Sequence, residues 1–145
     1  MGLFFTERWF DAPPEAVFAA IQNPTRLARW WGPTGFSNSF EVCDFRPGGL
    51  WRFTMHGPDG TDYPNECVFA EIVPNARVCI DHVVAPLFRL TITLTGQGGG
   101  TQLMWEQVLA DPALANKLRH IIEPSNEQNL DRLGQELQPG GSNGD

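Results

Sequence analysis

The segment at residues 87–95 alternates strictly between apolar and polar side chains, and this pattern constrains the fold more than any other feature of the chain. The apolar set is Phe88, Leu90, Ile92 and Leu94, and the polar set is Arg89, Thr91, Thr93 and Thr95. Successive side chains of a β-strand point to opposite faces of a sheet, so a period of two predicts a strand with one buried face. The sheet that contains this strand must therefore be covered on one side.

Further predicted strands flank this segment, and turn residues separate them. The expected strands cover residues 36–45, 50–56, 65–73, 77–84 and 101–109. The separating residues are Gly48-Gly49, Gly57-Pro58-Asp59-Gly60, Pro74-Asn75 and Gly98-Gly99-Gly100. Glycine, proline and asparagine favour tight turns, and strands joined by tight turns pair in antiparallel fashion. The pattern therefore indicates one antiparallel meander.

Short helices are expected before the meander. A first strand is predicted at residues 3–10, and helices follow at residues 15–22 and 25–31. The stretch Asp11-Ala12-Pro13-Pro14-Glu15 favours a helix start, because a capping residue precedes proline in the first turn. Asn23-Pro24 then marks the corner between the two helices.

A terminal helical region begins at Asp111-Pro112 and carries an apolar stripe as far as Leu137. Pro124 breaks or kinks it, and residues 125–128 resemble a capping box, so one kinked helix and two separate helices both stay open. The whole order predicts an α+β fold in which this region covers the apolar face of the sheet. A strongly curved sheet wrapped on one helix encloses a space unless large side chains fill it.

A chain of 145 residues suits one domain, which is expected at residues 1–138. Residues 139–145 contain no apolar residue and are expected to form a disordered tail. The first ten residues, MGLFFTERWF, lack the basic region and long apolar run of a signal peptide, so the expected location is the cytoplasm.

The charge of the chain argues against several classes of partner. The net charge is −7 and the sequence pI is about 4.8. A nucleic-acid binder needs lysine and arginine to displace counterions from phosphates, so no nucleic-acid partner is expected. Anionic membrane surfaces are disfavoured for the same reason, and no stretch has the apolar length of a membrane span.

Neither a metal site nor a disulfide framework is expected. The chain has three cysteines, Cys43, Cys67 and Cys79, and three histidines, His56, His82 and His120. An odd number of cysteines without C-x-x-C spacing is typical of small buried apolar residues. The histidines have no ligand spacing. No phosphate loop, nucleotide fingerprint or nucleophile elbow is present, so no cofactor is predicted.

Six stretches, in order, resemble the family of the C-terminal domain of the heat-shock-protein-90 ATPase activator, within the START-like, birch-pollen-allergen-like superfamily. They are FDAPPEAVF from residue 10, Pro24 through RWWGP at residue 33, DFRPGGLW from residue 44, PDG from residue 58, GGT from residue 99 and NEQNLDRL from residue 126. The resemblance implies a helix-grip fold. In such a fold a curved antiparallel sheet of about six or seven strands closes on a long C-terminal helix, with two short helices after the first strand and a cavity between sheet and helix.

Aromatic residues and one histidine are the candidate ligand-binding residues. They are Trp30, Trp31, Trp51, Phe53, Phe69, His82, Phe88 and Trp105. Core and pocket wall are the same surface in this fold, so plain packing is the alternative for each of them. Trp30 and Trp31 are adjacent and cannot point the same way on a helix. One is expected to pack inward, and the other to cap the cavity or lie on the surface.

No residue is assigned as catalytic. If the chain is an enzyme, His82, Asp81 and Glu66 are the candidate acids or bases. The structural alternatives are a hydrogen-bonded core histidine and two solvent-facing carboxylates. Asp44 and Arg46 are two residues apart and are expected to form a charge pair or to fix a turn.

The sequence predicts a protein that binds a small hydrophobic or aromatic molecule between the sheet and the terminal helix, with His82, Arg52 or Glu66 to orient it. An enzyme resembling the polyketide cyclases and dehydratases of the superfamily is the alternative. A co-chaperone that stimulates a heat-shock-protein-90 ATPase is the second alternative, suggested by the family name. An exposed tryptophan such as Trp9 or Trp31 can mark an interface, so a homodimer stays open.

Overall fold

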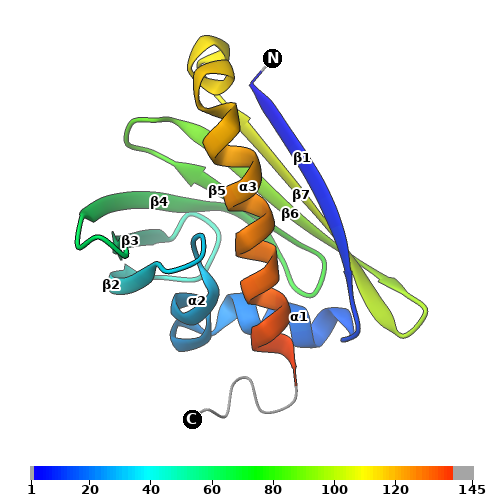
Figure 1. Cartoon of the computed structure of the whole chain (residues 1–145). Coiled ribbons are helices and arrows are strands. Elements are labelled where there is room, and N and C mark those ends of the chain that lie inside the picture. The colour runs from blue at the N-terminus through cyan, green and yellow to red at the C-terminus, as the bar shows by residue number, and fades with distance from the viewer. Residues whose placement is uncertain (1, 139–145) are drawn as a thin grey trace.

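A curved sheet with one long helix across its concave side dominates the computed structural model, which describes residues 2–138 (Figure 1). The elements are β1 (Leu3–Phe10), α1 (Pro14–Gln22), α2 (Pro24–Trp30), β2 (Ser37–Cys43), β3 (Leu50–His56), β4 (Asp62–Val73), β5 (Arg77–His82), β6 (Phe88–Gln97), β7 (Gly100–Leu109) and α3 (Pro112–Leu137). The predicted α+β, helix-grip fold is confirmed. The expected tail at residues 139–145 lies outside the described residues.

All seven strands belong to one antiparallel sheet in the order β1-β7-β6-β5-β4-β3-β2. The first strand pairs with the last, so that Leu3 lies opposite Val108, and β1 and β2 form the two edges. Register shifts occur in β2 between Phe40 and Val42 and in β4 between Phe69 and Glu71. Such bulges bend a strand and increase its twist, which helps this sheet to curl around α3.

The alternation seen in the sequence matches the burial of the strands. On β6, Leu90, Ile92 and Leu94 are buried on the concave face. On β3, Trp51 and Phe53 are buried in the same core. Their side chains meet those of α1, α2 and α3, so the concave face carries both the core and any space beneath the helix.

The terminal helical region is one continuous helix, which decides between the two alternatives left open by the sequence. Asp111 caps its start by accepting hydrogen bonds from the backbone N–H groups of Ala113 and Leu114. Pro124 lies inside α3, and residues 125–128 are helical and do not start a second helix. Proline removes one backbone hydrogen bond, but the packing of Leu130 and Leu133 against the sheet core keeps the helix in place.

Candidate functional site

A cavity of about 180 Å³ lies between the concave face of the sheet and α3. Residues of β3 to β7, of α3 and of the loop after α2 form its wall. Its apolar wall includes Trp31, Phe53, Ile80, Leu90 and Trp105. None of the described residues that line it is Asp, Glu, Lys or Arg. A dry apolar cavity of about 150 Å³ holds benzene, so this space suits a single aromatic ring with a short substituent.

The eight candidate residues divide into wall residues and packing residues. Trp31, Phe53, His82, Phe88 and Trp105 line the cavity. The other three, Trp30, Trp51 and Phe69, are buried in the core and are not among the described residues that line it. The ring of Trp51 stacks between those of Phe53 and Phe69, with centroids 4.2 and 5.5 Å away. The concave face therefore continues from a filled core into the cavity.

Trp30 and Trp31 are both buried, because the helix ends between them. Trp30 is the last residue of α2 and donates its indole N–H to the carbonyl oxygen of Ala20 at 3.0 Å. Trp31 has an extended backbone with ψ of 131°, so its ring turns towards Trp51 and Trp105, with centroids 5.0 and 6.0 Å away. The expectation that Trp31 is exposed at an interface is wrong, whereas Trp9 is 46% exposed.

His82 is a buried, hydrogen-bonded histidine in the cavity wall. Its Nδ1 donates to the carbonyl oxygen of Pro86 at 2.8 Å, and its Nε2 lies 2.7 Å from the side-chain oxygen of Asn65. The ring stacks on Phe88 with 4.7 Å between centroids. Both ring nitrogens are therefore engaged by the protein, and what His82 offers to the cavity is its ring.

The other candidate acid–base residues lie on the outer side of the sheet. Asp81 pairs with Arg89 at 2.7 Å and Glu66 with Arg52 at 3.4 Å, and these side chains are partly or largely exposed. The expectation that Arg52 or Glu66 orients a ligand in the cavity is wrong, because strand alternation turns them away from the concave face. Among the described candidates, only His82 reaches the cavity.

The turn at Asp44 and Arg46 behaves as predicted. Arg46 donates to the Asp44 carboxylate at 2.7 Å on an exposed surface. The backbone N–H of Arg46 also bonds to the carbonyl oxygen of Asp44 at 2.8 Å. The pair therefore fixes the strand connection and takes no part in the cavity.

The polar residues of the cavity wall were not predicted from the sequence. The inward positions on β7 are Leu103, Trp105, Gln107 and Leu109. Gln107 interrupts this apolar row, and the interruption is the one sequence pattern that could have indicated a polar wall residue. Gln107 accepts a hydrogen bond from Nδ2 of Asn126 at 3.0 Å. Asn129, on α3, accepts one from the backbone N–H of Gly32 at 3.2 Å. These amides give the cavity a polar end close to the helix.

Arg132 on α3 fastens the loop after α2, which forms one side of the cavity. Its guanidinium donates to four backbone carbonyl oxygens, those of Arg29, Trp31, Gly32 and Pro33, at 2.7 to 3.1 Å. Gly32 has φ of +98°, which favours glycine, and an added Cβ would lie 2.7 Å from the Met55 side chain. The loop is therefore held by α3 through side-chain to backbone bonds.

Glu136 forms a second link between α3 and α2. Its buried carboxylate accepts hydrogen bonds from Arg26 at 2.9 Å and from Arg29 at 3.0 Å. Burial is the largest single effect and raises the pKa of Glu136, but the hydrogen bonds and charges of the two arginines together outweigh it and hold the pKa below its ordinary value. The ionised carboxylate therefore stabilises the folded state.

This link predicts a pH-dependent loss of stability. A carboxylate whose pKa is lowered by folding stabilises the folded state fully when the pH is above the pKa that the group has in the unfolded chain. This stabilisation is lost as the pH falls through the pKa that the group has in the folded protein. Glu136→Gln is expected to lower the free energy of unfolding by about 1–3 kcal/mol at pH 7. Urea unfolding between pH 7 and pH 3 should show the variant and the wild type converging in acid. A difference that stays constant across this range would contradict the role of the charge.

The thiol of Cys67 lies in the cavity wall and is protonated at neutral pH. Burial raises its pKa to about 12, and the charges of Asp81 and Glu66 add to the shift. The thiolate is the nucleophilic form of cysteine, so this side chain is an apolar wall group. Cys79 is also buried, in agreement with the sequence, and Cys43 is half-buried.

Slow thiol chemistry at Cys67 follows from this environment. In a variant with Cys43→Ala and Cys79→Ala, the thiolate fraction of Cys67 at pH 8 is on the order of 10⁻⁴, against about 0.1 for an unperturbed thiol. An aromatic disulfide reagent should therefore react with the folded protein about a thousandfold more slowly than with the protein in guanidinium chloride. Equal rates would show an accessible, ionised thiol and would revise the description of the cavity.

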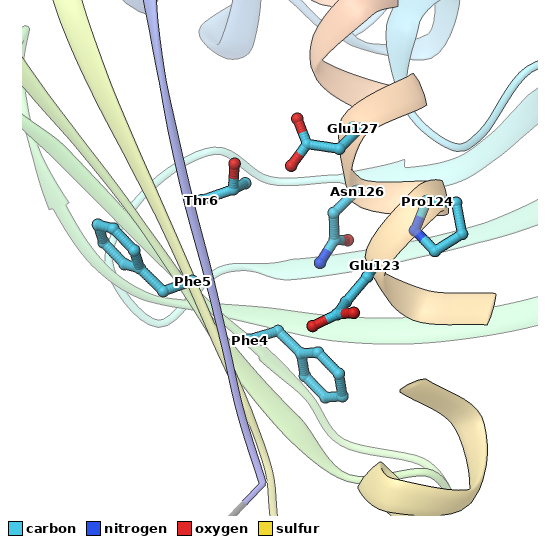
Figure 2. A pocket seen from close by; sticks show the side chains of 7 residues that line it. All are labelled: Phe4, Phe5, Thr6, Glu123, Pro124, Asn126 and Glu127. Atoms are coloured by element: carbon cyan, nitrogen blue, oxygen red, sulfur yellow. The ribbon is translucent and has the colours of Figure 1, made fainter. Parts of the chain in front are cut away.

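A second hollow lies outside the cavity, between the edge strand β1 and α3 (Figure 2). Its volume is about 250 Å³, and its walls are Phe4, Phe5, Thr6, Glu123, Pro124, Asn126 and Glu127. Figure 2 shows Phe4 and Phe5 on different sides of β1, with the carboxylates of Glu123 and Glu127 on the helix side. Two carboxylates make this hollow less suitable for an apolar ligand than the cavity. Asn126 lines both spaces.

The described residues hold neither a metal-binding cluster nor a membrane span. In residues 2–138, no three His, Cys, Asp or Glu side chains gather into a group that could bind a metal ion. No helix in the same part of the chain combines the length and apolar character needed to cross a bilayer.

Comparison with known proteins identifies the family. The model of the family described as Activator of Hsp90 ATPase homolog 1-like protein matches residues 11–138. A solved protein of Chromobacterium violaceum is 25% identical with a TM-score of 0.84, over 96% of this chain and 99% of that one. A protein of Arthrobacter aurescens shares the fold at 23% identity and a TM-score of 0.87, over 94% of this chain and 86% of that one.

The AHSA1 protein of Silicibacter pomeroyi also shares the fold, at 23% identity and a TM-score of 0.76, over 93% of this chain and 96% of that one. No curated protein matches the sequence. The family match runs from the start of the first helical region to the last described residue, and the helix-grip architecture agrees with it. The chain belongs to the Activator of Hsp90 ATPase homolog 1-like family.

Proposed function

We propose that this protein binds a small, uncharged aromatic or hydrophobic molecule in the cavity between the sheet and α3. The observation that carries the proposal is the cavity itself, about 180 Å³, walled by Trp31, Phe53 and Trp105 and free of charged side chains among the described residues. Apolar walls favour transfer of an apolar molecule from water, and the absence of counter-charges disfavours an ion. The family fold supports such a role.

The size of the cavity sets the expected affinity. A single-ring molecule would bury about 200 Å² of apolar surface, worth about 5 kcal/mol at about 25 cal/mol per Å², which corresponds to a Kd on the order of 0.1–1 mM. A ligand at ten times its Kd adds about 1.4 kcal/mol to the folded state and raises Tm by about 4 °C for a domain of this size. A screen of single-ring aromatic compounds by thermal shift can detect this.

A cavity-filling variant tests the location. Cys67→Phe extends an aromatic ring from β4 into the cavity and is expected to abolish the thermal shift, because the ligand loses its volume. Cys79→Phe is the matched control, since Cys79 lies on the outer face beside Thr91 and is not among the described wall residues. Near-UV circular dichroism verifies that both variants fold. An unchanged ligand shift in Cys67→Phe would place binding elsewhere, and the absence of any shift across the panel would defeat the proposal.

The cyclase-like alternative rests on His82, the one candidate acid or base in the wall. Both of its ring nitrogens are engaged by Pro86 and Asn65, so proton transfer would require one of these bonds to break.

The co-chaperone alternative depends on a surface that contacts a large ATPase. Recovery of this chain by a purified heat-shock-protein-90 chaperone in a pull-down would favour it over the binding proposal.

A further inference from the structure

We propose that the cavity selects ligands that carry an uncharged hydrogen-bond acceptor, above all a carbonyl oxygen, and that the indole N–H of Trp105 donates to it. This inference rests on the proposed function and names the ligand class of the same site: single-ring aromatic ketones, aldehydes and similar neutral carbonyl compounds.

The first observation is an unpartnered donor on a residue of the wall. Trp105 is 2% exposed and lines the cavity, and no group of residues 2–138 accepts a hydrogen bond from its Nε1. Two other indoles of this protein have a partner: Nε1 of Trp30 donates to the carbonyl oxygen of Ala20 and Nε1 of Trp9 to that of Gln97, at 3.0 and 3.1 Å. Leaving a buried donor without a partner destabilises the protein, and an acceptor on a ligand would reverse that loss.

The second observation is the state of the neighbouring amides. The side-chain oxygen of Asn129 is already bonded to the backbone N–H of Gly32, and that of Gln107 is bonded to Asn126. Each of these two residues therefore has its NH₂ group left to offer to the cavity. The polar end of the cavity therefore includes two amide NH₂ groups, which match an acceptor oxygen on the ligand, beside the side-chain oxygen of Asn126.

The third observation concerns charge. No carboxylate, ammonium or guanidinium group is among the described wall residues, and both ring nitrogens of His82 are engaged by the protein. A cation would lose its hydration here without gaining a counter-charge, and so would an anion beside the neutral imidazole of His82. A neutral acceptor can accept hydrogen bonds from these donors without the cost of desolvating a charge. The geometry therefore favours a carbonyl group over a carboxylate.

The chain offers its own control for the role of Trp105. Trp51 is also fully buried with an unpartnered Nε1, but it stacks inside the core and is not among the described wall residues. Removal of the indole N–H by Trp→Phe is the same chemical change at both positions. Only the change at Trp105 should alter the preference of the cavity for one ligand over another.

The test compares two isosteric ligands, acetophenone and α-methylstyrene, which differ by a carbonyl oxygen in place of a methylene group. Their Kd values are measured by calorimetry for the wild type, Trp105→Phe and Trp51→Phe. Using the ratio of the two Kd values cancels the different hydration of the ligands. Trp105→Phe is expected to reduce the relative preference for acetophenone about tenfold, as expected for one buried hydrogen bond, and Trp51→Phe is expected to leave it unchanged.

The outcomes separate this inference from the proposed function. If the wild type binds other single-ring compounds but not acetophenone, the inference is overturned and the proposed function stands; if no single-ring compound of the panel binds, both are overturned. If both bind and Trp105→Phe keeps the wild-type ratio, the inference is overturned and the proposed function stands. Benzoate should bind at least tenfold more weakly than acetophenone, and equal or tighter binding would overturn the requirement for an uncharged ligand.

A measurement on the wild type covers the case in which Trp105→Phe does not fold. In a ¹⁵N-labelled sample, acetophenone should shift one indole N–H resonance downfield and slow its exchange with solvent, whereas α-methylstyrene should not. The resonance is assigned to Trp105 through the bonds that connect the indole ring to the backbone of the same residue, so no variant is needed. If acetophenone binds and no indole proton shifts downfield, the proposal is overturned.

Discussion

Arg132→Met is expected to lower the free energy of unfolding by about 3–5 kcal/mol and to abolish ligand binding. The guanidinium donates to four backbone carbonyl oxygens of residues 29–33, and burial lowers its pKa, which indicates a desolvated charge. Methionine keeps the length of the side chain but leaves these carbonyl groups without a donor. Hydrogen bonds to charged groups are worth about 1.5–3 kcal/mol each and are not additive, so the total stays below their sum.

Arg77→Met is the matched control for this prediction. Arg77 pairs with Glu71 at 3.0 Å on the surface, and such exposed pairs contribute at most about 1 kcal/mol. Urea unfolding at pH 7 compares both variants with the wild type, and the thermal-shift screen reports binding. A loss below 1 kcal/mol for Arg132→Met would show that water replaces the guanidinium at the loop, and that the loop does not depend on α3.

Trp31→Ala is also expected to cost about 3–5 kcal/mol, because it removes a large buried ring from the aromatic cluster. Trp31 is 7% exposed, and its ring contacts Trp30, Trp51 and Trp105 with centroids 5.0 to 6.0 Å away. The space left by the indole would extend the cavity. A larger ligand such as 1-methylnaphthalene should therefore raise the Tm of the variant but not that of the wild type.

Trp9→Ala separates this effect from the general loss of an aromatic residue. Trp9 is 46% exposed, so its removal should cost about 1 kcal/mol and should not change the size of ligand accepted. Thermal unfolding with and without each ligand measures both quantities. Stabilisation of the wild type by the two-ring ligand would mean that the cavity is larger than its present walls allow, and failure of Trp31→Ala to respond would mean that the walls collapse into the space.

The strands could be predicted from the sequence because their patterns are local. β1 and β3 have the predicted bounds, and β6 begins within one residue of its prediction. In β3 and β6 the inward side chains are apolar, whereas β1 also turns Thr6 and Arg8 towards α3, and glycine or proline marks most of the turns. The resemblance to a known family added the direction of closure, with the terminal helix on the concave face.

The cavity could be predicted only in part, because it depends on contacts between distant segments. The position of Trp31 depends on α2 ending one residue earlier. The loop that follows is bound by Asn129 and Arg132, which lie 97 or more residues later in the sequence. The continuity of α3 through Pro124 depends on packing that outweighs a local break signal. The polar wall residues Gln107 and Asn129 carry no motif, and only the assembled sheet and helix bring them to one space.

The pairing of β1 with β7 has a consequence for how the protein is made. Leu3 lies opposite Val108, so the first strand has no partner in the sheet until the ribosome has produced the last one. At about 5–20 residues per second, that interval lasts on the order of 5–20 s. During it the apolar residues of β1, including Phe4 and Phe10, are available to chaperones or to other nascent chains. Completion of this sheet is therefore expected to be a late, post-translational step.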